Sequence, residues 1–198
     1  MAIPTPTNKK VFEGVPSQML ISGNRNTPSE LNVQNLVDVP EPDDIVSPTQ
    51  EAEPFMHLRI ARLGVDAPIR EVGLAMDGSM AVPKNPFDTG WYKQGPLPGE
   101  IGSAVITGHV DSITGAPAVF ADLDHLAIGD IIEVEGVQTT YTFRIREIRT
   151  YPAEADATDI FTSADGKAHL NLITCSGSWD ANTKQYTDRL VIFTNRVL

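Results

Sequence analysis

The strongest structural constraint in this sequence is the alternation of apolar and polar residues in DIIEVEGVQTTYTFRIREIRTY, residues 130–151. Successive side chains of a strand point to opposite faces, so a period of two predicts two half-buried strands. Gly136 interrupts the alternation at a turn signal, and we predict a hairpin there. Comparable short apolar segments run from about Phe55 to HLNLITC (169–175) and RLVIFTNRV (189–197).

Turn-forming residues separate these segments, since the chain contains 15 Gly and 15 Pro. A DG turn signal lies in MDGSMAVP (76–83); PAVFADLDHL (117–126) suggests a short helix, and the acidic stretch 153–163 suggests a short helix or loop. We therefore predict a mostly β domain in which about eight strands close into a barrel with one or two short helices, because closure removes exposed strand edges. An open sandwich is the alternative at this level.

Residues 1–54 have a different composition from the rest of the chain. They are rich in Pro, Asn, Ser, Thr and Glu, and their apolar residues form short clusters without a sustained period. This composition is typical of a flexible stalk or linker, although two apolar patches, 18–21 and 31–39, could dock on the domain. We predict two parts: a stalk or appendage over 1–54 and a catalytic domain over 55–198.

Charge and composition exclude several classes of function. A formal net charge of −11 argues against a basic face for nucleic acid or anionic lipid. The single cysteine excludes an intrachain disulfide and a cysteine-based zinc site. No apolar run is long enough to span a membrane, and no loop of clustered oxygen ligands for Ca²⁺ is visible. We expect a monomer without cofactor or metal.

Three residues that could carry chemistry lie at predicted junctions of strand and loop: His109 after AVITG, Cys175 at the end of LNLIT, and Arg189 before LVIF. A thiolate is stabilised by a neighbouring imidazolium, and a guanidinium or backbone N–H groups can stabilise an oxyanion. The three residues together suffice for thiol-based acyl transfer. Taken singly, each is more often structural: a buried cysteine, a structural histidine, a solvated arginine.

The other polar candidates are weaker. His57, His125 and His169 lie away from these junctions along the sequence, and we expect structural or surface roles for all three. Asp111 follows His109 by two residues and could orient its imidazole, but a role in a turn is the favoured interpretation.

The chain resembles a sortase, one of the cysteine transpeptidases of bacterial cell surfaces, most like class F with class E as near neighbour. The motifs are TGHVD (107–111), LITC (172–175) and RLVIF (189–193), supported by GWYKQGPLPGEIGSAV, GAPAVFADL and IGDIIEV. The resemblance covers roughly 55–198 and implies an eight-stranded sortase β-barrel, in agreement with the strand pattern.

The resemblance also implies an activity. Such an enzyme cleaves a C-terminal sorting signal of the LPxTG kind between Thr and Gly, and passes the acyl group to a cell-wall amine. It implies Cys175 as nucleophile, His109 as general acid and then base, and Arg189 as the residue that positions substrate and stabilises the oxyanion. Thr174, the backbone N–H of Ser176, and Thr107 are candidates for further contacts with the peptide.

One position departs from the pattern. Many class F sortases carry the arginine two residues earlier, where this chain has Thr187. Positions 187 and 189 share a face of a strand, so Arg189 can act from the same side, shifted by about 7 Å if the register is unchanged.

The resemblance further implies an extracytoplasmic enzyme that is anchored to the membrane in its native form, with the anchor outside this chain. A rival enzyme class, the YkuD-type L,D-transpeptidases, has His two residues before Cys; here Leu172, Ile173 and Thr174 precede Cys175. A non-enzymatic β-barrel binding or adhesion module with an inert, buried Cys175 is the alternative function.

Overall fold

The computed structural model describes residues 56–198, so the stalk predicted over 1–54 lies outside the described residues. The elements in chain order are β1 (Met56–Ile60), η1 (Ala61–Leu63), β2 (Val65–Val72), β3 (Thr89–Tyr92), β4 (Gly102–Thr107), η2 (Leu123–His125), β5 (Ile131–Glu135), β6 (Thr140–Pro152), η3 (Thr158–Ile160), β7 (Ala168–Asp180) and β8 (Gln185–Val197).

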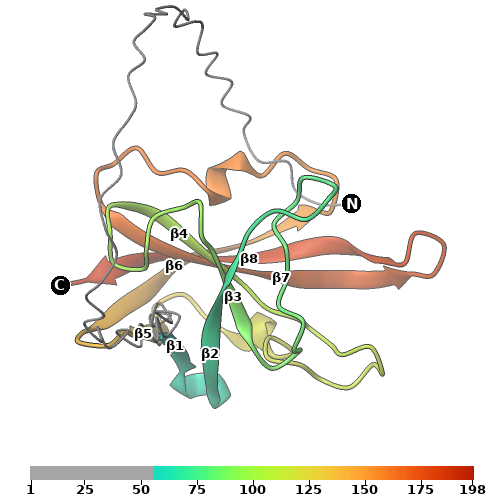
Figure 1. Ribbon diagram of the computed structural model, residues 1–198, viewed down its shortest axis with the longest axis horizontal. Helices are drawn as coiled ribbons and strands as arrows, with labels where there is room; N and C mark the ends of the chain where they lie inside the picture. Colours follow the sequence, from blue (N-terminus) through green and yellow to red (C-terminus); the bar gives the residue numbers. More distant parts are fainter. Residues whose placement is uncertain (1–55) are drawn as a thin grey trace, which may run out of the picture. The chain divides into compact units, whose positions relative to one another are not determined.

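The eight strands form one closed barrel in the order β1-β2-β3-β4-β7-β8-β6-β5, which is completed by antiparallel pairing of β1 with β5 (Figure 1). The predicted barrel is confirmed and the open sandwich is excluded. The predicted hairpin around Gly136 is β5–β6, in which Ile132 pairs with Phe143 and Val134 with Tyr141. The alternating apolar residues of these strands, Ile132, Val134, Phe143 and Ile145, are buried in the core.

Helix is confined to three short 3₁₀ turns in the described residues, and none of their helices is long and apolar enough to cross a membrane. The predicted helix over 117–126 is helical only at η2. Its apolar residues Phe120, Leu123 and Leu126 are all buried and recur every three residues. Side chains three apart eclipse in a 3₁₀ turn, which presents them to the barrel on one side without a full α-helix.

The last two strands are longer than the apolar pattern predicts, and the predicted end of a strand at Cys175 is wrong. β7 continues to Asp180 and β8 begins at Gln185, so that the hairpin projects beyond the barrel (Figure 1). Pairing changes register by one residue between Ser176 and Trp179, where Gly177 has φ +79°. Burial does end at Thr174. Cys175 therefore marks the rim of the buried barrel within a continuing strand.

Two pairs of strands are parallel, β2 with β3 and β4 with β7. A parallel pair needs a crossover connection, because the chain must return to the starting end of the next strand. Residues 73–88 form the crossover from β2 to β3, and residues 153–167 are the last part of the longer path from β4 to β7. A second apolar cluster, which includes Val105, Ile160, Ile173 and Val191, packs between the barrel wall and these connections.

Candidate active site

The register of the barrel brings His109, Cys175 and Arg189 level with one another. β4 and β7 run parallel, and their last pair joins Thr107 to Ile173, so His109 and Cys175 each come two residues later at the same end. On the other side of β7, Cys175 is the direct partner of Arg189 on antiparallel β8. Opposite residues of such a pair project their side chains to the same face with Cβ atoms about 5 Å apart. Cys175 therefore lies between the other two.

This face is the outer surface of the barrel wall. Alternation along β7 places Leu170 and Leu172 in the barrel core, and Ile173 in the outer cluster together with residues of the 153–167 connection. Cys175 shares the side of Ile173. A cavity of about 290 Å³, which we call the thiol cavity, opens here; it is lined by Thr107, His109, Ile173, Cys175, Arg189, Phe161 and residues of the 73–88 connection.

Two hydrogen bonds position His109: one joins its backbone carbonyl to Phe120, and the other joins its ring to the backbone carbonyl of Pro83. Gly108 allows the ring of Phe120 to pack against the chain, since a Cβ at this position would lie 2.5 Å from that ring. The Phe120 N–H donates to the His109 carbonyl at 2.9 Å. His109 Nε2 lies 2.8 Å from the Pro83 carbonyl oxygen. A carbonyl only accepts, so Nε2 carries a hydrogen and Nδ1 is the nitrogen left for proton exchange.

Cys175 is half-buried. Burial raises the pKa of its thiol; the positive charge of Arg189 acts to lower that pKa, and the negative charge of Asp111 acts to raise it further. Within residues 56–198 no hydrogen bond joins the Cys175 thiol to His109. Both groups line the thiol cavity. The charges of Arg189 and Asp111 have opposite effects on the pKa of the thiol.

Arg189 is oriented by its own strand: one guanidinium nitrogen, Nη1, donates to the carbonyl of Asp188 at 2.8 Å and to that of Tyr186 at 3.1 Å. Thr187, the alternative position for the arginine, lies at the β-bulge. Its hydroxyl donates to Asp188 at 2.7 Å and accepts the Ser178 N–H at 3.1 Å. Arg189 is therefore the direct strand partner of Cys175. Thr187 instead stabilises the start of the projecting hairpin through its contacts with Ser178 and Asp188.

The three additional candidates differ in their surroundings. Thr107 is buried and lines the thiol cavity. The buried Thr174 hydroxyl donates to the Gly108 carbonyl at 2.8 Å, which ties the residue before the cysteine to the residue before the histidine. Ser176 Oγ is buried and has no hydrogen-bond partner among the described residues. The hydroxyl of Thr174 thus contributes a link between the two strands.

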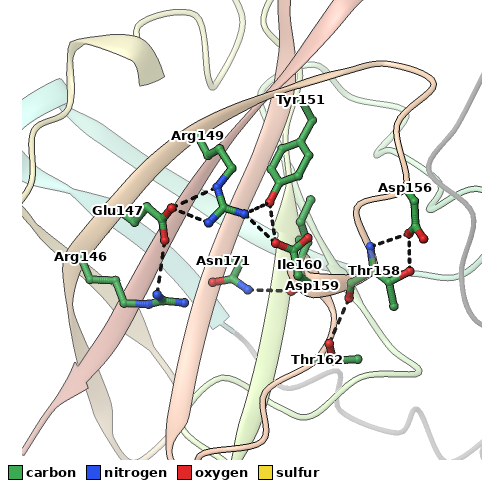
Figure 2. Close-up of polar contacts among 10 residues, drawn as sticks. All are labelled: Arg146, Glu147, Arg149, Tyr151, Asp156, Thr158, Asp159, Ile160, Thr162 and Asn171. Atoms are coloured by element: carbon green, nitrogen blue, oxygen red, sulfur yellow. Dashed lines mark hydrogen bonds and ion pairs between the residues drawn. The ribbon is translucent and has the colours of Figure 1, made fainter.

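A polar network ties the 153–167 connection to strands β6 and β7 (Figure 2). Arg149 on β6 donates to Tyr151 and Asp159 at 2.6 and 2.7 Å, and Asn171 on β7 donates to the Ile160 carbonyl at 2.6 Å. Burial, together with the hydrogen bond to Asp159, raises the pKa of Tyr151 to about 12. The network fixes η3 and with it Phe161, whose ring meets Tyr92 edge-on at 5.5 Å and lines the cavity.

The remaining histidines have structural surroundings. His57 contacts Asp66 at 2.9 Å, His125 lies 3.7 Å from Asp122, and the buried His169 lies between the Thr194 carbonyl and Asp165. The part of the chain that the structure describes has no cluster of three or more His, Cys, Asp or Glu side chains able to hold a metal ion.

Asp111 combines two contacts. Its backbone forms a bridge with Pro117, which agrees with the predicted role in a turn. Its carboxylate also accepts the Tyr186 hydroxyl at 2.7 Å, a contact with the projecting hairpin that the sequence did not indicate.

Pro83 and Phe161 are also missing from the sequence prediction. Pro83 contacts His109 through its backbone carbonyl, and such a contact does not depend on the identity of the side chain, so the sequence does not reveal it. Phe161 lies within the irregular 153–167 connection, which the hydrogen bond between Arg149 and Asp159 helps to hold in place.

The opposing charges on the thiol give a testable pH dependence. Alkylation by iodoacetamide reports Cys175 alone, because the chain has one cysteine. We expect the alkylation rate of the wild-type protein to rise with pH until it levels off above the ordinary thiol pKa of about 8.5. Arg189→Met removes a charge that lowers the pKa, so its curve moves to higher pH; Asp111→Asn removes a charge that raises it, so its curve moves to lower pH. Coincident curves for all three proteins would contradict this electrostatic description.

Comparison with known proteins agrees with the barrel fold. Residues 58–197 match the model of the sortase domain family. No curated protein sequence matches the chain.

Among solved structures, a sortase D5 transpeptidase from Clostridium perfringens is similar at 21% identity and TM-score 0.56, with 74% of this chain and 80% of that chain covered. Sortase C1 from Streptococcus agalactiae is similar at 23% identity and TM-score 0.59, with 76% and 70% covered. Sortase C-1 from Actinomyces oris is similar at 23% identity and TM-score 0.56, with 75% and 76% covered.

These identities support a shared fold, and the family match covers most of the chain, including His109, Cys175 and Arg189. The chain belongs to the sortase family.

Proposed function

We propose that the protein is a cysteine transpeptidase that cleaves an LPxTG-like sorting signal between Thr and Gly, holds the acyl group as a thioester on Cys175, and transfers it to a cell-wall amine. The observation that carries this proposal is the alignment of His109, Cys175 and Arg189 across three neighbouring strands, all lining one cavity. In this proposal His109 supplies an acid–base group on one side of the thiol, and Arg189 supplies a cation on the other.

In the first step, the Cys175 thiolate attacks the carbonyl carbon of the substrate threonine. Arg189, on the same face and directly opposite Cys175, stabilises the negative charge that develops on the carbonyl oxygen, and the backbone N–H of Ser176 is a second candidate donor. The bond between carbon and nitrogen then breaks, and His109 gives the proton on Nδ1 to the departing glycine amine. The product is a thioester on Cys175.

In the second step, an amine nitrogen attacks the thioester carbon while His109 accepts its proton. The carbon–sulfur bond breaks, its electron pair returns to Sγ, and the thiolate and imidazolium are restored. The Pro83 carbonyl holds Nε2 through both steps, so a single nitrogen exchanges the proton. The hydrogen bond from Thr174 to Gly108 holds the ends of β4 and β7 together. We assign Thr107, which lines the cavity, a contact with the peptide.

Sortases act outside the cytoplasm at the cell envelope, and we place this protein there. Assignment to class F, anchoring to the membrane and action as a monomer remain part of the proposal. The support for class F is the set of sequence motifs around His109 and Cys175.

The test is a transfer assay with the full chain, a fluorogenic LPxTG peptide library and a primary amine, followed by mass spectrometry. We expect cleavage after Thr only and a product in which the amine is joined to the Thr carbonyl; a peptide with the order of Thr and Gly reversed is the control. Absence of cleavage across the library, with a Cys175 that alkylates normally, would favour the binding module instead.

A further inference from the structure

His109 borders two hollows. The first is the thiol cavity, which also contains Cys175 and Arg189. The second, of about 740 Å³, is lined by His109, Asp111, the 112–115 turn, Trp179 and Tyr186, together with Lys84 and Pro86. Cys175 lines only the first hollow. In the proposed reaction the acyl peptide is still attached to Cys175 when the amine arrives, and the second hollow supplies a separate approach to the same imidazole.

The side chains of the second hollow suit a cation. Trp179 and Tyr186 meet edge-on, with ring centroids 5.3 Å apart and planes 69° apart, so the two rings form a corner. Trp179 is 56% exposed and offers its ring to solvent. Aromatic faces attract ammonium groups, and a nearby carboxylate strengthens that attraction. The carboxylate here is Asp111.

A hydrogen bond to Tyr186 holds the Asp111 carboxylate beside this aromatic corner. One carboxylate oxygen, Oδ2, accepts the Tyr186 hydroxyl at 2.7 Å, and this bond raises the pKa of Tyr186 to about 12, so the hydroxyl keeps its hydrogen at neutral pH. Among residues 56–198 the other oxygen, Oδ1, has no hydrogen-bond partner. It remains available to accept a hydrogen bond from a bound group.

The second hollow is also electrostatically coupled to the thiol, because the negative charge of Asp111 raises the pKa of Cys175. Among residues 56–198, Lys84 is the only lysine or arginine that lines it. The chain as a whole carries a net charge of −11, which draws cations toward its surface.

We propose that the second hollow is the binding site for the amine acceptor, and that Trp179, Tyr186 and Asp111 recognise it as a primary alkylammonium. The inference rests on the proposed function and specifies its second substrate. The rings of Trp179 and Tyr186 contact the ammonium and the apolar stem next to it, and Asp111 accepts a hydrogen bond from the nitrogen.

The bound ammonium first releases one proton to water and becomes a nucleophilic amine. Its nitrogen then bonds to the thioester carbon on Cys175, the carbon–sulfur bond breaks with its electrons passing to Sγ, and the second proton passes to His109 Nδ1. The products are an amide, a thiolate, an imidazolium and the proton released to water, so atoms and charge balance.

The experiment measures the ratio of transferred to hydrolysed peptide in the full chain at fixed n-butylamine concentration. Both products come from one acyl-enzyme, so any change in acylation rate cancels from the ratio. We expect Trp179→Ala to lower it about two- to fivefold, the range for an exposed cation–aromatic contact, and Trp179→Phe to restore part of it. Ile128→Ala, which removes an exposed apolar side chain outside both hollows, is the matched control and should leave the ratio unchanged.

A second readout uses tetramethylammonium chloride, a cation that cannot attack the thioester. We expect it to reduce transfer but not hydrolysis in the wild-type protein, relative to sodium chloride at equal ionic strength, and to have less effect in Trp179→Ala. An unchanged ratio in Trp179→Ala, or equal effects of the two salts, would overturn the inference. Failure to form any acyl-enzyme would instead overturn the proposed function.

Discussion

Cys175→Ala is expected to abolish peptide cleavage and amine transfer, with a loss of at least about 10³-fold, the range found when a catalytic nucleophile is removed. The half-buried thiol lies at the point where burial ends on β7, so its replacement leaves the buried core intact. We therefore expect the melting temperature to change little. Circular dichroism against temperature and the fluorogenic assay together check both expectations.

Cys175→Ser provides the matched comparison, because a hydroxyl has nearly the same shape as the thiol but does not ionise near neutral pH. We expect it to be as inactive as Cys175→Ala. Retention of full activity in either variant would remove Cys175 from the mechanism and leave the barrel as a binding module.

His109→Gln is the second change with a large expected effect. The Gln side-chain amide can still donate to the Pro83 carbonyl in place of Nε2, but nothing replaces the proton on Nδ1. Loss of general acid–base catalysis lowers rates by about 10²- to 10⁴-fold. We expect a loss in this range for cleavage of the peptide substrate, measured as kcat/KM.

The leaving group separates this role from a structural one. A p-nitrophenyl ester of the same acyl peptide needs no proton on its leaving group, so we expect His109→Gln to lose much less activity toward the ester than toward the peptide. Equal losses for the two substrates would show that His109 does not act as the general acid. Arg149→Met, which loosens the network around η3 and Phe161 but leaves His109 and Cys175 unchanged, serves as a control for general disturbance of the cavity wall.

The strands were predictable because one face of each strand meets the core. The alternation of Ile132 and Val134 and the apolar runs before His109 and Cys175 reflect burial against the barrel interior and the outer cluster. The same logic fails for the ends of β7 and β8, where the residues from Ser176 to Asp180 are exposed or half-exposed and, apart from Trp179, polar or small. Those strands continue because they pair with each other across a bulge, and pairing through backbone atoms leaves no apolar signal.

The site was predictable in part for a related reason. Motifs identify His109, Cys175 and Arg189, and the parallel register of β4 and β7 explains why residues 66 positions apart lie level. The Pro83 carbonyl and the Asp111–Tyr186 contact depend on how the 73–88 connection and the projecting hairpin fold back, which a single sequence does not encode as a local pattern.

The central claim is that a thioester forms on Cys175, and intact-mass spectrometry of the acid-quenched protein tests it most directly. After mixing with an LPxTG peptide in the absence of amine, we expect the protein mass to increase by the acyl segment that ends at Thr. The adduct should map to Cys175, disappear on treatment with hydroxylamine, and be absent from Cys175→Ala. Cleavage of the peptide without an adduct, or an adduct that persists in Cys175→Ala, would contradict the account.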